Sequence, residues 1–345
     1  MKLTLHPFDL PTRHPFTIAR STTTVQRTVV VELQQDGARG FGEATESGYY
    51  AASAGAIVAA LERARPQIEA HHLTDPAAFW EAVRPELGGS TFAQCALDTA
   101  AYDLWGKLRG KPVWRLWGLD LADCPPSDYT IGIDSIEVMR AKLREFPGWP
   151  VYKIKLGRPN DVEVVRALRE ETDVVFRVDA NCAWGVDETL AKAAVLKDLG
   201  VELIEQPLAP GQDDAMERLY RESPLPLVAD ESCQVEADVE KCGRGRFHGV
   251  NVKLVKCGGL TPAKRMIDRA RQLDLRVMVG CFTQSTVGIS AAAQLLPLVD
   301  YADLDGAVLL AEDIATGVRL EQGRVVFPDV DGCGVELRSG GRTAN

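Results

Sequence analysis

The sequence lacks the features of several broad classes of protein. No run of 18 apolar residues occurs among its 345 residues, which argues against a membrane-spanning helix and a membrane partner. The first residues, Met1 to Pro7, contain no apolar stretch like that of a secretory signal, so we expect a cytoplasmic protein. Lysine and arginine number 39 against 49 aspartates and glutamates, a formal charge of −10, which disfavours nucleic acid as a partner.

Cysteine and histidine are too scattered to suggest a zinc site. None of the eight cysteines forms a Cys-x-x-Cys pair, and no two of the five histidines are four residues apart. We therefore expect the cysteines to be reduced thiols, mostly in the core. Neither G-x-G-x-x-G nor a Walker sequence is present, so nothing favours a nucleotide cofactor. With 46% hydrophobic and 26% charged residues, the composition is that of a globular protein.

Residues 1–124 have the pattern of a separate α+β domain. The β-branched run 28–33, followed by the turn Asp36-Gly37, predicts a hairpin. Apolar residues at helical spacing predict helices over 51–70 and 90–108.

From residue 125 to 310, short β-type runs alternate with amphipathic helical stretches. The eight β-type runs are 129–133, 151–156, 174–178, 202–205, 225–229, 249–254, 276–280 and 301–304. Eight such runs separated by helices fit a closed parallel α/β barrel better than an open sheet. The remaining segment, 311–345, has turns and short strands, and we expect it to return to the first domain.

Ionisable residues lie at the ends of five consecutive predicted strands. Lys155, Asp179, Glu205, Asp230 and Lys253 follow one another at steps of 24, 26, 25 and 23 residues. Each βα unit returns the chain to the same rim, so we expect these groups to meet where barrel enzymes keep their active sites. Any one of them alone would more commonly be a surface charge or a helix cap, but a shared rim favours function.

The rim residues predict a metal between two bases. Asp179, Glu205 and Asp230 offer oxygen ligands only, which suits a hard cation, and we expect one Mg²⁺ per subunit. Lys155 and Lys253 could reach a bound carbon from opposite faces. If one removes the proton beside a carboxylate and the other returns it, the carbon is inverted through an enediolate, which predicts racemisation or epimerisation.

The sequence around these residues resembles the enolase superfamily, in its muconate-lactonizing subgroup. The matching segments are K-I-K at 153–155, V-D-A-N at 178–181, I-E-Q-P at 204–207, A-D-E-S at 229–232 and N-V-K-L-V-K-C-G-G-L at 251–260. The resemblance covers almost the whole chain. It implies an α/β fold, a modified TIM barrel of the (β/α)7β form with an N-terminal α+β capping domain. It also implies that Asn181 and Glu231 lie beside the metal ligands.

The last barrel strand is similar to the D-x-D signature of dipeptide epimerases in that superfamily. Asp303 and Asp305 would hold the free ammonium of a dipeptide, and a pair of carboxylates suits a cation. The resemblance places Thr130 and Cys281 near the substrate and matches Arg20 to an arginine that holds a glutamate side chain.

Lys153 is two residues before Lys155, so it also points into the barrel, and we expect it to line the substrate site. The predicted function is thus Mg²⁺-dependent epimerisation of the C-terminal residue of a dipeptide, with L-Ala-D/L-Glu favoured. The expected partners are this small-molecule substrate and further copies of the chain in a homo-oligomer.

Two other classes of function stay open at this point. Cycloisomerases, N-acylamino acid racemases and o-succinylbenzoate synthases share the lysines and the metal but do not need a cation-binding D-x-D. A barrel that only binds a ligand would need no metal. A mandelate-racemase-type His/Asp pair is disfavoured, because no histidine follows His248.

Overall fold

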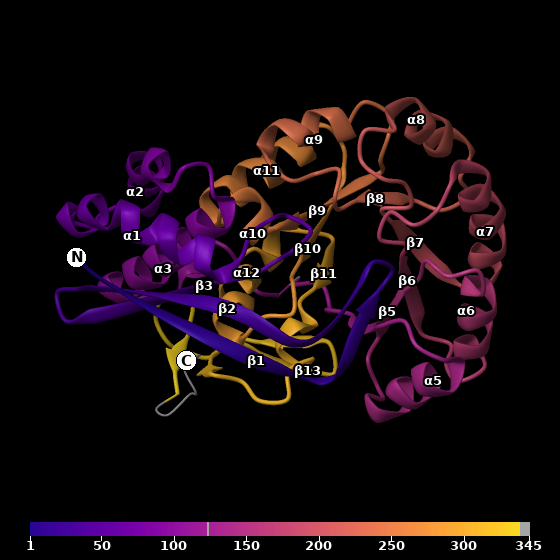
Figure 1. Ribbon diagram of the computed structural model, residues 1–345, viewed down its shortest axis with the longest axis horizontal. Helices are drawn as coiled ribbons and strands as arrows, with labels where there is room; N and C mark the ends of the chain where they lie inside the picture. Colours follow the sequence, from indigo (N-terminus) through magenta and orange to yellow (C-terminus); the bar gives the residue numbers. More distant parts are fainter. Residues whose placement is uncertain (123, 339–345) are drawn as a thin grey trace.

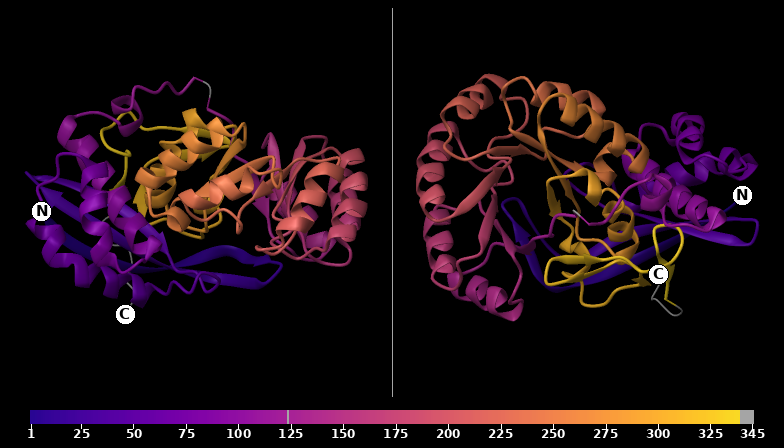
Figure 2. Two further views of the ribbon diagram at one scale, coloured as in Figure 1. Left: turned by 90° about the horizontal axis from the view of Figure 1, so that it is seen from above. Right: turned by 180° about the vertical axis from the view of Figure 1, so that it is seen from behind.

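The chain forms a parallel barrel with an antiparallel sheet and its helices packed to one side (Figures 1 and 2). The computed structural model describes residues 1–122 and 124–338. The end of the predicted tail segment, 339–345, lies outside the described residues.

The N-terminal region begins with a three-stranded antiparallel sheet. Its strands are β1 (Lys2–Ile18), β2 (Ser21–Gln35) and β3 (Ala38–Thr45), in the order β1-β2-β3. The predicted turn joins β2 to β3, with φ of 51° at Asp36 and 82° at Gly37. The long strand β1 was not predicted, because three prolines interrupt its β-type pattern. Proline is tolerated there because β1 is an edge strand.

Helices follow this sheet along the chain, and the first and third α-helices pack on it. They are α1 (Ala54–Ala70), α2 (Pro76–Val83), the 3-10 turn η1 (Arg84–Leu87), α3 (Thr91–Arg109) and α4 (Val113–Leu116). Ser53, Asp75 and Ser90 each accept a backbone N–H at the start of a helix, and α3 ends at left-handed Gly110. Helix α3 lies so close to β3 that a Cβ at Gly42 would be 2.2 Å from the Ala96 carbonyl oxygen.

Eight parallel strands form the barrel. They are β4 (Tyr129–Ile131), β5 (Val151–Lys155), β6 (Val175–Asp179), β7 (Val201–Glu205), β8 (Leu227–Ala229), β9 (Gly249–Lys253), β10 (Arg276–Gly280) and β11 (Tyr301–Asp303). They pair in sequence order from β4 to β11. Ser127, before β4, makes a parallel bridge to Ala302 of β11, which closes the ring. The predicted α/β barrel is confirmed.

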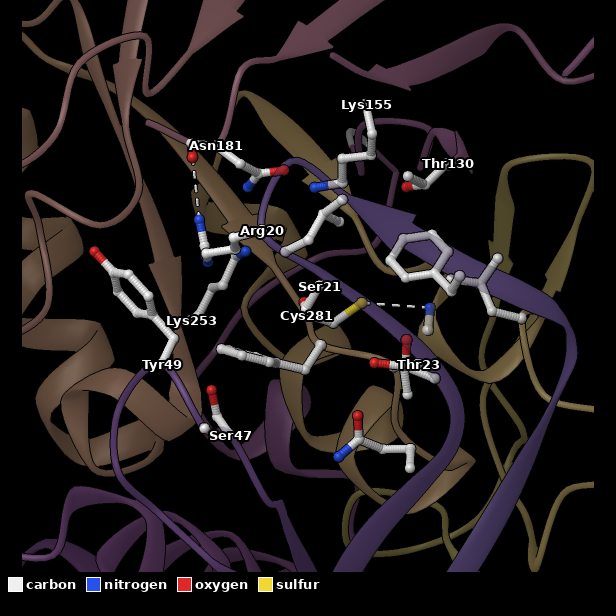
Figure 3. A pocket seen from close by; sticks show the side chains of 18 of the residues that line it. Arg20, Ser21, Thr23, Ser47, Tyr49, Thr130, Lys155, Asn181, Lys253 and Cys281 are labelled. Carbon is white, nitrogen blue, oxygen red and sulfur yellow. Dashed lines mark hydrogen bonds between the residues drawn. The ribbon is translucent and has the colours of Figure 1, made fainter. Parts of the chain in front are cut away.

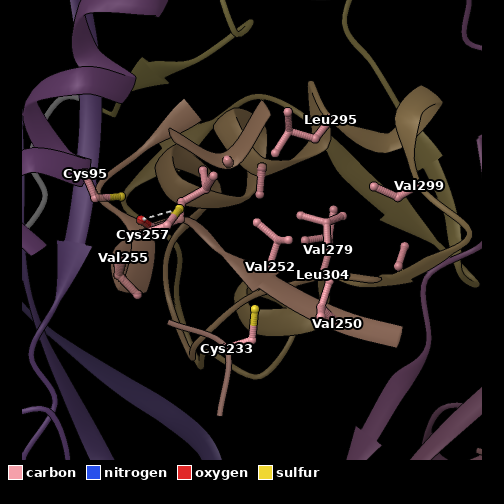
Figure 4. Packing of buried hydrophobic residues seen from close by; sticks show 14 of the residues in the cluster. Cys95, Cys233, Val250, Val252, Val255, Cys257, Val279, Leu295, Val299 and Leu304 are labelled. Carbon is pink, nitrogen blue, oxygen red and sulfur yellow. Dashed lines mark hydrogen bonds between the residues drawn. The ribbon is translucent and has the colours of Figure 1, made fainter. Parts of the chain in front are cut away.

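The helices that connect these strands form the outer layer of the barrel (Figure 1). They are α5 (Ile136–Glu145), α6 (Asp161–Arg169), α7 (Val186–Asp198), α8 (Asp213–Glu222), α9 (Glu236–Cys242), the short α10 (Leu254–Cys257), α11 (Leu260–Gln272) and α12 (Thr286–Ala293), with 3-10 turns η2 (Leu296–Leu298) and η3 (Asp305–Ala307). Apolar residues fill the space between these helices and the strands. Cysteines contribute to this core, as Figure 4 shows for Cys95, Cys233 and Cys257.

The barrel interior is layered because alternate strand residues point inward. Leu203, Val228 and Met278 form a small buried apolar cluster at one level of the lumen. Two residues further along these strands come Glu205, Asp230 and Gly280, at the carboxyl ends. This apolar cluster therefore lies beneath part of the charged mouth.

The C-terminal segment contains short strand pairs and packs against the N-terminal region. Its strands are β12 (Ala315–Thr316), β13 (Arg319–Glu321), β14 (Arg324–Val326) and β15 (Glu336–Leu337). The Cys333 N–H donates to Asp103 of α3 at 2.7 Å, and Lys107 Nζ donates to the Val335 carbonyl at 2.8 Å. The division into 1–124, 125–310 and 311–345 as separate units stays a prediction. No helix of the described residues has the length and apolar character needed to span a bilayer.

Candidate active site

The carboxyl ends of the strands open into a cavity of about 520 Å³. Its walls come from two sources (Figure 3). Lys155, Asp230 and Lys253 belong to the barrel rim, whereas Arg20 and Tyr49 belong to loops of the N-terminal region. The cavity therefore lies between the two parts of the molecule.

Three buried carboxylates meet at the rim. Asp179 and Glu205 are the last residues of β6 and β7, and Asp230 directly follows β8. One ligand oxygen of each lies within 4.8 Å of those of the others. The pairing of β6 with β7 sets Asp179 beside Glu205, and Asp230 comes two residues after Val228, which pairs with Glu205. Clustered oxygen ligands of this kind fit Mg²⁺.

Three lysines contact the acidic group. Lys155 Nζ lies 2.6 Å from Asp179 Oδ2, and Lys253 Nζ lies 2.8 Å from Asp230 Oδ2. The completely buried Lys153 lies 2.6 Å from Glu205 Oε2 and 2.6 Å from Asp303 Oδ2. The five rim residues predicted from their spacing are thus brought together, with Lys153 beneath them.

The order of the strands places these groups around the ring. Three strands, β6, β7 and β8, separate β5 from β9 on one side, and three, β10, β11 and β4, separate them on the other. Lys155 of β5 and Lys253 of β9 therefore come from opposite sides of the barrel. The acidic trio is centred on β7, and Asp303 lies on β11, directly across from it.

Burial and neighbouring charges perturb the acids strongly. Burial favours the neutral form, but Lys253 and Lys256 bring the pKa of Asp230 well below its ordinary value. Burial raises the pKa of Glu205 to about 7, because the attraction of Lys153 does not offset the loss of solvation and the charges of Asp179 and Asp230.

The neighbouring acids raise the pKa values of two buried lysines in the site. Burial alone lowers the pKa of Lys153, but Asp303, Glu205 and Asp179 raise it well above its ordinary value. The pKa of Lys253 is also raised, with Asp230 as the main attractive partner against burial.

Neighbouring residues fix the orientation of the Glu205 and Asp230 carboxylates. The Gln206 side chain accepts from the N–H groups of Asp230 and Ser232 at 3.0 Å each, which ties the end of β7 to the end of β8. Asn251 donates to Glu205 at 2.9 Å. Lys256 is buried and donates to the Asp230 side chain and backbone, both at 2.6 Å.

Asn251 and Gln206 were not among the predicted site residues, and the strand pattern offers a signal for Asn251 alone. Asn251 is two residues before Lys253, so alternation along β9 points it inward. Gln206 follows Glu205 directly and has a positive φ of 36°, which no sequence pattern announces.

A second acidic group lies at β11. Cys281, Asp303 and Asp305 each offer a ligand atom within 4.8 Å of the others. Asp305 accepts the Thr130 N–H at 2.6 Å, and burial together with the charge of Asp303 raises its pKa to about 7. Cys281 Sγ accepts the Gly306 N–H at 3.3 Å. All four predicted residues of this side of the cavity, Thr130, Cys281, Asp303 and Asp305, lie on its wall.

Arg20 reaches the barrel from the turn between β1 and β2. It forms an ion pair of 2.7 Å with buried Glu231. It also donates to the Asn181 carbonyl at 3.2 Å, a hydrogen bond drawn in Figure 3. The Tyr49 ring lies over its guanidinium, 4.2 Å from Cζ to the ring centroid. The structure thus brings predicted Arg20, Asn181 and Glu231 into direct contact.

Two family descriptions match the chain. Residues 138–340 match the enolase C-terminal domain-like family, and residues 3–118 match the mandelate racemase / muconate lactonizing enzyme N-terminal domain. The chain belongs to the enolase superfamily. The resemblance noted in the sequence is confirmed, and so is the capping-domain architecture typical of this superfamily.

Individual members of the superfamily are similar over nearly their whole length. A Flavobacterium johnsoniae protein named L-Ala-D/L-amino acid epimerase is 50% identical over 337 residues, 98% of this chain and 100% of that protein. The substrate-liganded L-Ala-D/L-Glu epimerase of Bacillus subtilis has a TM-score of 0.92 at 26% identity, covering 97% of this chain and 98% of that one.

A further solved structure shows what such a site can hold. The dipeptide epimerase of Enterococcus faecalis, complexed with Mg and the dipeptide L-Leu-L-Tyr, has a TM-score of 0.88 at 27% identity, covering 97% of this chain and 98% of that one. These relatives are epimerases, which are isomerases, and the predicted enzyme class is confirmed.

Proposed function

We propose that this member of the enolase superfamily is a Mg²⁺-dependent dipeptide epimerase that inverts the α-carbon of the C-terminal residue. The observation that carries the proposal is the placement of four groups around the barrel. Acids centred on β7 face acids on β11, and two lysines occupy the sides between them. The names of the relatives agree with this activity.

The two acidic groups suit the two charged ends of a dipeptide. The group at β11, with Asp303 and Asp305, suits the ammonium of the N-terminal residue. The carboxylate of the C-terminal residue then faces the metal ligands across the cavity. This orientation brings the α-carbon of the C-terminal residue between Lys155 and Lys253.

The lysines would then move one proton across the α-carbon. One lysine, as the neutral amine, takes the α-proton and becomes an ammonium. The other, already an ammonium, donates a proton to the opposite face and becomes the neutral amine. The number of protons is unchanged, and the configuration at carbon is reversed. Opposite strands β5 and β9 suit the lysines to opposite faces of the same carbon.

The acidic trio fits the predicted metal. Asp179, Glu205 and Asp230 would hold Mg²⁺, because their oxygens are clustered and buried and no softer ligand is among them. When bound, Mg²⁺ would offset the negative charge that develops on the substrate carboxylate as the proton leaves.

The test is isotope exchange in heavy water with L-Ala-L-Xaa and L-Ala-D-Xaa dipeptides and Mg²⁺. The intact enzyme should exchange and invert both epimers. Lys155→Met and Lys253→Met should both lose inversion, while each retains exchange with only one epimer, and a different one, because each keeps the base for one face. Full inversion by either variant would rule out the two-base assignment. Lys192, an ion-paired lysine of helix α7, supplies the matched control Lys192→Met.

A further inference from the structure

Arg20 has three partners that belong to the protein itself. Its guanidinium contacts the Glu231 carboxylate, the Asn181 carbonyl and the face of the Tyr49 ring. Glu231 and Asn181 belong to the barrel, whereas Arg20 and Tyr49 belong to the N-terminal region. The arginine, in the turn of the β1–β2 hairpin, thus links this hairpin to the residues that follow Asp230 and Asp179.

The charge of the buried Glu231 carboxylate is neutralised by its ion pair with Arg20. Its side chain is 0% exposed, and Arg20 is the one cation within ion-pair distance of it in the described part of the chain. Neither carboxylate oxygen has a hydrogen-bond donor with acceptable geometry among the described residues. If Arg20 turned to a substrate carboxylate, Glu231 would remain as a buried charge without a close partner, which is strongly unfavourable.

The remaining wall on this side of the cavity offers no replacement for Arg20. Apart from the rim residues and the Asp303/Asp305 pair, the charged residues described on the cavity wall are Arg20 and Glu46. Glu46 has the wrong sign for an acidic side chain. The surrounding surface is uncharged and mixes apolar residues with polar ones: Phe16, Ile18, Val25, Tyr50, Phe282 and Leu309 beside Ser21, Thr23, Gln26, Ser47 and Thr283.

We infer that Arg20 neutralises Glu231 and holds the hairpin on the barrel, and that the enzyme prefers dipeptides whose C-terminal side chain is uncharged. The inference rests on the proposed epimerase function and specifies its substrate class. It assigns Arg20 a role different from glutamate recognition, which the resemblance to other family members had suggested. Arg20 is then a positioning residue, because it acts through Glu231 and the hairpin.

The experiment compares L-Ala-L-Gln with L-Ala-L-Glu, which have nearly the same shape and differ in charge. We expect kcat/KM of the intact enzyme to be at least about tenfold higher for the glutamine dipeptide, with L-Ala-L-Met also above L-Ala-L-Glu. In Arg20→Met, both rates should fall together, so that the Gln/Glu ratio changes by less than about threefold. A selective loss of L-Ala-L-Glu turnover in Arg20→Met would overturn the inference.

A second variant tests the same pairing from the other side. Glu231→Gln releases Arg20 from its ion pair, so the Gln/Glu ratio should shift by about tenfold toward the glutamate dipeptide. The double variant Arg20→Met with Glu231→Gln should abolish this shift. An unchanged ratio in Glu231→Gln would contradict the assignment. If Glu231→Gln does not fold, as judged by its melting curve, the Arg20→Met ratio decides alone.

The two proposals fail in different ways. If the intact enzyme with Mg²⁺ exchanges no dipeptide of the panel, the epimerase function itself is wrong. If it epimerises L-Ala-L-Glu or a cationic dipeptide best, the function stands and only the preference for uncharged side chains is wrong.

Discussion

The two walls of the cavity differ in how their residues are held. On the barrel side, Lys155 and Lys253 are the last residues of strands, Asp230 directly follows a strand, and all three are buried. On the N-terminal side, Arg20 lies in a turn and Tyr49, in a loop, is 46% exposed. The rigid wall carries the groups proposed for the chemistry, and the loop wall carries the groups proposed to hold the N-terminal region on the barrel. Substitutions on the two walls should therefore have different kinetic signatures.

The largest effect is expected at the proposed metal ligands. Glu205→Gln removes a ligand charge, so affinity for Mg²⁺ should fall by more than about 100-fold, and epimerisation should fall with it. Calorimetric titration with Mg²⁺ measures the affinity without relying on activity. Glu202→Gln, on the same strand but paired with Arg177, is the matched control and should bind Mg²⁺ normally. Equal Mg²⁺ affinity in Glu205→Gln and the control would exclude the proposed site.

The next effect concerns the ammonium end of the substrate. Asp303→Asn with Asp305→Asn removes the charge opposite the proposed metal ligands, so kcat/KM for a free dipeptide should fall by about 10- to 100-fold. Turnover of the N-acetylated dipeptide, which has no ammonium, should already be low and should change much less. If the intact enzyme preferred the acetylated substrate, an N-acylamino acid racemase would become the better assignment.

The two walls also differ in how many of their residues the sequence could predict. Lys155, Asp179, Glu205, Asp230 and Lys253 could be found because every βα unit has a similar length and returns to one rim. Lys153 could be found by alternation along one strand. Regular structure converts spacing in the sequence into position in space, and for this reason most of the barrel and its charged mouth were predictable.

The loop wall follows no such rule. The contact between Arg20 and Glu231 joins residues 211 positions apart, counted as 231 − 20, and depends on how the hairpin folds over the barrel. The turn that carries Arg20 follows β1, a strand that was not predicted because prolines interrupt its pattern. Tyr49 lies in a loop with no periodic pattern, so its stacking on Arg20 could not be anticipated.

A smaller effect is expected when the loop wall alone is changed. Tyr49→Ala removes the ring that covers Arg20, which should raise KM by about 3- to 10-fold and leave kcat within about twofold. Steady-state kinetics with L-Ala-L-Gln measure both constants. Tyr220 also stacks on a neighbour, His248, but lies outside the cavity, so Tyr220→Ala should change neither. A fall in kcat as large as that in the lysine variants would remove the distinction between the two walls.

The smallest effect on turnover is expected at a contact between the N-terminal region and the barrel that lies outside the cavity lining. Asp98 of α3 accepts the Thr261 N–H at 2.9 Å and its hydroxyl at 2.8 Å, at the start of barrel helix α11. Asp98→Asn replaces one acceptor oxygen by an amide donor, which should lower the free energy of unfolding by about 1–3 kcal/mol. Asp268→Asn, at an exposed position of α11, is the control. Values of kcat should be unchanged in both variants.

The loss of unfolding free energy in Asp98→Asn should depend on pH, which gives a sharper test. Burial raises the pKa of Asp98 to about 7, from an ordinary value of 3.8, despite the hydrogen bonds from Thr261. The folded protein therefore binds the proton more tightly than the unfolded chain. The contribution of Asp98 to stability is complete below the unfolded pKa and is lost as pH rises through about 7. Urea unfolding should show that the difference between the intact protein and Asp98→Asn shrinks from about pH 5 to about pH 8. A difference that grows with pH would mean that Asp98 is ionised when folded and joins the two regions as a charge.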